Sequence, residues 1–175
     1  AAQRGLREFK PQHLSNTAWA FATADHPAPA PQNLSNTVWA YATAGHPAPA
    51  LLDAIAKEAA PRLREFDPQN LSNTVWAYAT AGHPAPALLD AIAEEAAPRL
   101  REFNPQNLSN TVWAYATAGH PAPALLDAIA KEAAPRLREF NPQNLSNTVW
   151  AYATAGHPAP ALLDAIAKEA APRLR

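Results

Sequence analysis

The sequence contains no cysteine, no methionine and only five glycines among its 175 residues. The absence of cysteine excludes a disulfide framework and thiolate chemistry. The apolar runs are only a few residues long, far short of the roughly 20 needed to cross a bilayer, so no membrane partner is expected. A formal net charge of −1 provides no global basic field for nucleic acid. No signal or transit peptide is recognisable, but the chain begins with Ala1 rather than methionine, so a targeting segment could lie upstream.

What the sequence does contain is internal repetition. Four tryptophans, Trp39, Trp76, Trp113 and Trp150, follow one another at intervals of 37 residues. The unit at 104–140 reads NPQNLSNTVWAYATAGHPAPALLDAIAKEAAPRLREF, and only two positions vary among the later copies. The 19 prolines fall at fixed places in this unit, so they punctuate it rather than mark low complexity. A fixed period of this length is typical of repeat architectures.

The repeat divides the chain as one helical-repeat domain over residues 1–175. The copy that contains Trp19 is truncated, because Trp19 precedes Trp39 by only 20 residues and the counterpart of 51–67 is missing. We expect this deletion to disturb the regular stacking. The expected segments are the end of a preceding second helix (1–9), a truncated repeat (10–30) and four repeats (31–66, 67–103, 104–140 and 141–175).

Each unit predicts two helices, illustrated by the copy at 67–103. Asp67 is a good N-cap, Pro68 suits the first helical position and Gly82 suits the C′ position, which predicts a first helix over about 68–81. The second helix is expected to begin at Pro86 and to run to about Arg101. Pro98 lies inside that helix, and its missing N–H and its ring should kink or interrupt the last turns.

Both helices are amphipathic with a period of 3.6 residues. The first places Leu71, Val75, Tyr78 and Ala79 on one face, and the second groups Leu88, Leu89, Ile92, Ala96, Leu100 and Phe103. One hairpin cannot bury both apolar faces, whereas stacked copies make a continuous core. The predicted fold class is therefore all-α, an α-solenoid of tandem 37-residue helix-turn-helix repeats whose first repeat is truncated. It should have at least eight helices, no strand and the first helices on the concave side.

A polar stripe on the first helix supplies the candidate binding residues. Its tryptophan could stack nucleobases or could seal the contact between adjacent repeats. Its asparagine could touch a ligand or could join a ladder between neighbouring helices. The candidate residues are Gln32, Asn36, Trp39 and Thr43, then Gln69, Asn73, Trp76 and Thr80, then Gln106, Asn110, Trp113 and Thr117, and finally Gln143, Asn147, Trp150 and Thr154.

The charged residues and histidines fit structural roles. Five histidines recur at the interhelical turn without a second ligand at close spacing, so no metal site is predicted. Acidic and basic residues of the second helix form i,i+4 pairs of two kinds, as in Asp53–Lys57 and Glu95–Arg99. A row of Arg64, Arg101 and Arg138 could contact phosphate. No catalytic constellation or glycine-rich phosphate loop is present, so we expect neither an enzyme, nor a cofactor, nor a small-molecule substrate.

The string PQNLSNTVWAYATAG followed by PAPALLDAIAKEAAPRLREF resembles the octotricopeptide and heptatricopeptide repeats. The resemblance lies in the Pro-Gln-x-Leu-x-Asn opening, the Trp-Ala of the first helix and the Pro-Arg-Leu near the end of the second. A length of 37 suits the heptatricopeptide class. These helical hairpins belong to organellar RNA-binding proteins, relatives of FAST-kinase-domain and RAP proteins. The resemblance implies single-stranded RNA as the partner and a chloroplast or mitochondrion as the location.

The expected function is therefore a sequence-repetitive RNA-binding scaffold in organellar RNA metabolism. Repeats that carry identical side chains at identical spacing should prefer identical bases, which predicts a homopolymer-like target or an unselective preference for single strands. One alternative is an armadillo-like scaffold for protein–protein interaction, since concave solenoid surfaces also bind peptides. Another is a non-functional fragment of a larger array.

Overall fold

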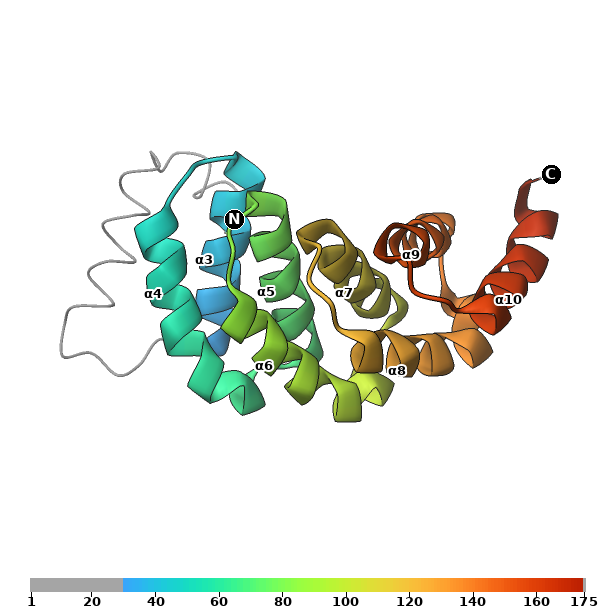
Figure 1. The fold of residues 1–175 in the computed structure, drawn as a ribbon, viewed down its shortest axis with the longest axis horizontal. Coiled ribbons are helices and arrows are strands. Elements are labelled where there is room, and N and C mark those ends of the chain that lie inside the picture. The colour runs from blue at the N-terminus through green and yellow to red at the C-terminus, as the bar shows by residue number, and fades with distance from the viewer. Residues whose placement is uncertain (1–29, 175) are drawn as a thin grey trace, which may run out of the picture.

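The structure, a computed structural model, describes residues 30–174 as a row of helical hairpins (Figure 1). This part of the chain contains eight α-helices, four short 3-10 helices and no strand. The expected all-α solenoid of tandem repeats is confirmed. The expectations for 1–9, for the truncated repeat at 10–30 and for Trp19 lie outside the described residues.

Every repeat has the same two helices, here called helix A and helix B, followed by a 3-10 segment. The helices A are α3 (Pro31–Ala44), α5 (Pro68–Ala81), α7 (Pro105–Ala118) and α9 (Pro142–Ala155). The helices B are α4 (Pro49–Ala59), α6 (Pro86–Ala96), α8 (Pro123–Ala133) and α10 (Pro160–Ala170). The 3-10 segments are η2 (Ala60–Glu65), η3 (Ala97–Glu102), η4 (Ala134–Glu139) and η5 (Ala171–Leu174).

Local signals set both ends of helix A. The Asp67 carboxylate accepts a hydrogen bond of 2.6 Å from the Asn70 N–H, as expected of an N-cap. Gly82 ends α5 with φ of 60°, a left-handed conformation that glycine adopts without steric cost. The N–H of His83 then reaches the Tyr78 carbonyl, which completes a Schellman motif. The predicted helix over 68–81 is therefore confirmed at both ends.

Pro98 interrupts helix B, as the sequence predicts. The α-helical part α6 ends at Ala96, and the chain continues to Glu102 as the 3-10 segment η3. A proline has no N–H to donate and its ring clashes with the preceding turn, so the α-helical ladder cannot continue through it. The α-helix is thus shorter than the expected run to Arg101, and each repeat ends in a tighter, separate turn.

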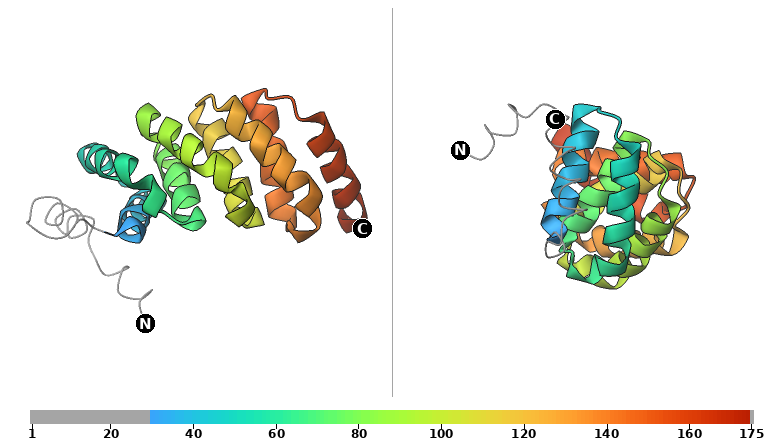
Figure 2. Two further views of the ribbon diagram at one scale, coloured as in Figure 1. Left: turned by 90° about the horizontal axis from the view of Figure 1, so that it is seen from below. Right: turned by 90° about the vertical axis from the view of Figure 1, so that its left-hand side faces the viewer.

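The repeats stack so that the helices A form an inner layer and the helices B an outer layer (Figures 1 and 2). Consecutive helices A pack against one another along their length, whereas consecutive helices B touch each other at few places. The 3-10 segment of one repeat bridges to helix B of the next. Close spacing on one side and wide spacing on the other makes the array curve with the helices A inside, as expected.

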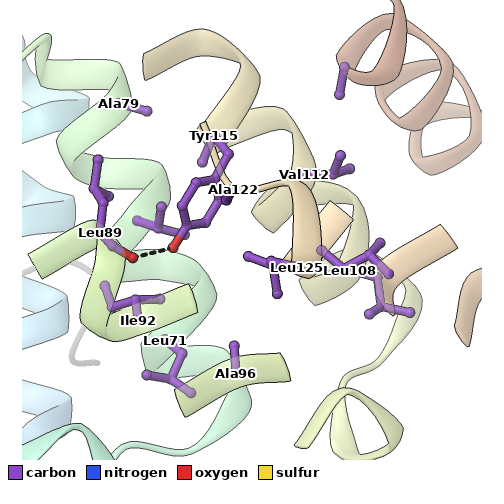
Figure 3. Close-up of a cluster of buried hydrophobic side chains, with 14 of the residues drawn as sticks. Leu71, Ala79, Leu89, Ile92, Ala96, Leu108, Val112, Tyr115, Ala122 and Leu125 are labelled. Carbon is purple, nitrogen blue, oxygen red and sulfur yellow. Dashed lines mark hydrogen bonds between the residues drawn. The ribbon is translucent and has the colours of Figure 1, made fainter. Parts of the chain in front are cut away.

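The core runs unbroken through all described repeats. Leu71, Val75 and Tyr78 of α5 are fully buried, and Ile92 and Phe103 close the core from the outer layer. Figure 3 shows how side chains of neighbouring repeats interleave, with the Tyr115 hydroxyl reaching the Leu89 carbonyl of the repeat before. The apolar faces read from the sequence are thus the buried faces, and each is completed by the adjacent repeat.

Candidate functional site

The sixteen candidate residues form one stripe along the inner surface of the helix A layer. In α5 the stripe comprises Gln69, Asn73, Trp76 and Thr80, whose spacing of four, three and four residues keeps them on one helix face. Leu71 and Tyr78 are on the opposite face and point into the core. The glutamines and threonines are exposed in all four repeats, and the asparagines and tryptophans are exposed or partly exposed.

The tryptophans form a row across the repeats. The rings of Trp76 and Trp113 have centroids 6.2 Å apart and planes inclined by 28°, and Trp113 and Trp150 repeat this arrangement at 6.2 Å and 30°. Trp39 and Trp150 are each 46% exposed. Trp76, Trp113 and Trp150 therefore contact one another between repeats, as the packing interpretation predicts, while part of the row stays exposed.

The stripe asparagines do not form the ladder between helices. A ladder exists in α7 and α9, but it uses the asparagine three residues earlier: the Asn107 amide donates to the Ser72 hydroxyl at 3.0 Å, and the Asn144 amide to Ser109 at 3.1 Å. Both bonds are buried. Within residues 30–174, the side-chain amides of Asn73 and Asn110 have no hydrogen-bond partner. Their donors and acceptors are consequently available at the surface.

The other polar residues of the stripe are partly engaged with their own helix. The Gln143 amide donates to Asn147 Oδ1 at 2.7 Å, and the Thr43 hydroxyl donates to the Trp39 carbonyl at 2.7 Å. Both contacts are at exposed positions, where water or a ligand can replace a partner at little cost. Gln69 and Gln106 are equally exposed. The stripe thus carries amide donors and acceptors in every described repeat.

The inner surface is uncharged. None of the four helices A contains a charged residue, since each reads PQNLSNTVWAYATA. The row of Arg64, Arg101 and Arg138 is exposed but lies in the 3-10 segments, which pack mainly on helices B. These arginines therefore belong to the outer layer rather than to the stripe.

The interhelical histidines have a role that the sequence reading missed. His83 Nε2 lies 2.8 Å from Asp53 Oδ1 of the preceding repeat, and His120 and Asp90 form the same contact at 2.7 Å. His157 repeats it with Asp127 at 2.8 Å. The two residues are always 30 positions apart, a separation that only the stacking of repeats makes close.

This contact also corrects part of the charge pairing. In the described residues the aspartates of α4 and α8 pair with these histidines, and no ion pair joins Asp53 to Lys57 or Asp127 to Lys131. The expected glutamate–arginine pairs are present, for example Glu95 with Arg99 at 3.1 Å. The arginine gains a second acceptor, since Arg99 Nη2 donates to the Phe66 carbonyl of the preceding repeat at 2.8 Å.

Neither a metal-binding group nor a membrane-spanning helix is found in the part of the chain that the structure describes. No group of three or more histidine, cysteine, aspartate or glutamate residues could hold a metal ion there. None of the described helices is long and apolar enough to cross a membrane. One open hollow of about 240 Å³ lies in the outer layer between η4 and α10, with Arg138 and Lys168 on its wall.

No protein-family model matches the chain, and no curated protein is significantly similar to it. In each hairpin the site presents a flat apolar ring together with amide donors and acceptors. It presents no charged group.

Proposed function

We propose that the inner stripe binds single-stranded RNA. The observation that carries the proposal is the row of partly exposed tryptophan rings bordered by amides at the repeat period. Each nucleobase has a face that stacks on an aromatic ring, and stacking of this kind tolerates any base. The unpartnered amides of Asn73 and Asn110 can donate and accept at once, as the edges of bases require.

A single strand fits this surface better than a duplex. Side chains cannot read the deep, narrow major groove of A-form RNA, whereas the bases of a single strand can be splayed out and stacked. The resemblance to heptatricopeptide repeats supports the same partner and suggests an organellar setting. Because the stripe residues are identical in every described repeat, the target we propose is homopolymer-like rather than a mixed sequence.

A protein-interaction scaffold is the second candidate, and one observation favours it. Phosphate contacts normally supply much of the affinity for nucleic acid, yet the inner surface has no cation to make them. Amides and aromatic rings on an uncharged concave surface also suit an extended peptide. In that case the same stripe would bind a polypeptide, with the tryptophans as the anchors.

Titration of the chain with the four RNA homopolymers and one mixed-sequence oligonucleotide, at low salt, tests the proposal. We expect one homopolymer to bind best. Stacking contributes about 1–3 kcal/mol per base, so the Trp76→Ala and Trp113→Ala substitutions should each weaken binding about 5- to 150-fold. Asn73→Ala with Asn110→Ala should weaken it further, and circular dichroism should show that all variants remain helical.

The matched control is Arg64→Ala with Arg101→Ala, which removes two exposed side chains of the outer layer and should leave the affinity unchanged. A clear preference for the mixed sequence would refute the homopolymer target. Absence of binding to any RNA would refute the proposal and favour the protein-interaction scaffold.

A further inference from the structure

Each described repeat carries two side-chain amides on the inner stripe. In α5 they belong to Gln69 and Asn73, which lie one turn apart on the same face of the helix. The corresponding amides of α9 come within 2.7 Å of each other, from Gln143 Nε2 to Asn147 Oδ1. The two amides of one repeat are therefore close enough to contact the same base.

The tryptophan ring lies beside these amides. Trp76 follows Asn73 by three residues, so the indole is one turn further along the same helix face. An indole consists of two fused rings, as a purine does, whereas a pyrimidine has one ring. A stacked purine therefore overlaps the indole more extensively than a pyrimidine, and differences in stacking strength produce base preferences on aromatic surfaces of this kind.

The stripe lacks the side chains that distinguish guanine and cytosine. Arginine or lysine pairs with the two acceptors N7 and O6 of guanine, and aspartate or glutamate accepts from the amino group of cytosine. None of the four helices A contains any of these residues, since each reads PQNLSNTVWAYATA. What remains is threonine, which contacts bases without a clear preference, and the amides, which pair with N6 and N7 of adenine through two hydrogen bonds.

Adenine also matches two amides better than any other base does. An amide presents a donor beside an acceptor, so it pairs fully where a base presents an acceptor beside a donor. On the edges away from the ribose, adenine has this pattern twice, at N6 with N7 and at N6 with N1, because N6 carries two hydrogens. Guanine has two acceptors where adenine has N6 and N7, and pyrimidines have no N7. The other bases can therefore pair fully with only one of the two amides.

We propose that the inner stripe selects adenine, so that its target is an adenine-rich single strand. Each repeat stacks one adenine on its tryptophan and binds N6, N7 and N1 through its two amides. This inference rests on the proposed function, and it names the base that the identical repeats prefer.

Competition binding at low salt among adenine, cytosine and uracil homopolymers tests the selection with the wild-type chain. We expect the adenine strand to bind best, and isolated guanines within that strand to weaken it. Replacement of every adenine by 7-deazaadenine removes N7 and should weaken binding by at least about 5-fold, the effect of losing one bidentate pair. The matched control is 3-deazaadenine, which lacks a ring nitrogen on neither of these edges. It should bind as adenine does at mildly alkaline pH, where N1 of both analogues is unprotonated.

Leucine substitutions test whether the asparagines make the selection. Leucine has nearly the shape of asparagine but neither its donor nor its acceptor. Asn73 and Asn110 are partly exposed, so the variant with Asn73→Leu and Asn110→Leu should fold. It should lose most of the preference for adenine over uracil and still bind both strands through the tryptophans. The matched control is Thr80→Val with Thr117→Val, which changes the same repeats on the same stripe and should retain the preference.

The outcomes separate this inference from the proposed function. Equal binding of the three homopolymers would overturn the selection of adenine and leave RNA binding intact. So would equal binding of the adenine and 7-deazaadenine strands, or a leucine variant that keeps the wild-type preference. Absence of binding to every strand would instead refute the proposed function and the selection of adenine together.

Discussion

The inner and outer layers repeat with the same period but differ in chemistry. Consecutive helices A pack side by side through uncharged contacts, such as the buried bond from Asn107 to Ser72. Consecutive helices B meet mainly through 3-10 segments and carry the charges, including the Glu95–Arg99 pair and the aspartates that contact histidines. The outer layer thus carries the charges that the helices A lack, and the inner layer exposes aromatic and amide groups instead.

The two layers are tied together by buried tyrosines. The hydroxyl of Tyr78 donates to the Leu52 carbonyl at 2.6 Å, and Tyr115 and Tyr152 repeat the contact with the carbonyls of Leu89 and Leu126. Burial raises the pKa of all three hydroxyls well above the ordinary value, and a nearby aspartate raises it further.

The largest effect we predict is a loss of stability at alkaline pH, because the tyrosines ionise in the unfolded chain before they ionise in the folded one. The stabilisation is fully present below about pH 10, where an unfolded tyrosine begins to ionise, and falls as pH rises towards the folded-state pKa. Above about pH 10, the ionisation of each tyrosine should lower the free energy of unfolding by about 1.4 kcal/mol per pH unit. For the three tyrosines together, the loss should be roughly 4 kcal/mol at pH 11. Denaturant unfolding followed by circular dichroism between pH 8 and pH 11 measures this loss.

Tyr115→Phe is the matched control for the alkaline loss. At neutral pH it removes one hydrogen bond to Leu89 and should lower the unfolding free energy by about 1 kcal/mol. Above pH 10 its stability should fall less steeply than that of the wild type, by about one third. Equal slopes for the two proteins would mean that these tyrosines do not link the layers in the way the structure shows.

A smaller effect should follow from the contact between histidine and aspartate in the outer layer. Asp90 is exposed, so Asp90→Asn should lower the unfolding free energy by no more than about 1 kcal/mol, and the difference should shrink at high salt. Glu94→Gln changes the same charge in the same helix, where the described residues supply no partner. The Glu94→Gln variant should leave the free energy of unfolding unchanged. If it lost as much stability as Asp90→Asn, the contact between Asp90 and His120 would not be the cause of the effect.

The helices could be predicted from local signals in the sequence. The contacts between repeats could not be predicted in this way. Asp67, Pro68 and Gly82 act within a few residues of their own positions, so the bounds of helix A could be read from the sequence. The contact between His83 and Asp53 spans 30 residues and depends on how two hairpins stack, which a repeat period does not specify.

The candidate stripe shows the same division between local and long-range information. Helical periodicity placed Gln69, Asn73, Trp76 and Thr80 on one surface, and the structure has them there. It did not show that Asn70, rather than Asn73, is buried beside the preceding helix A. That distinction depends on the rotation of each helix within the layer, which packing between repeats determines.

The salt dependence of RNA affinity tests the separation of the two layers most directly. The measurement is the dissociation constant of the best-binding homopolymer across the range from about 50 to 200 mM salt. If the uncharged stripe provides the contacts, the logarithm of the association constant (the reciprocal of the dissociation constant) should change little with log salt, with a slope shallower than about −0.7, the value for one phosphate contact. A slope steeper than about −2, equivalent to about three phosphates, would contradict the account, because it would mean that basic side chains of the outer layer bind the strand.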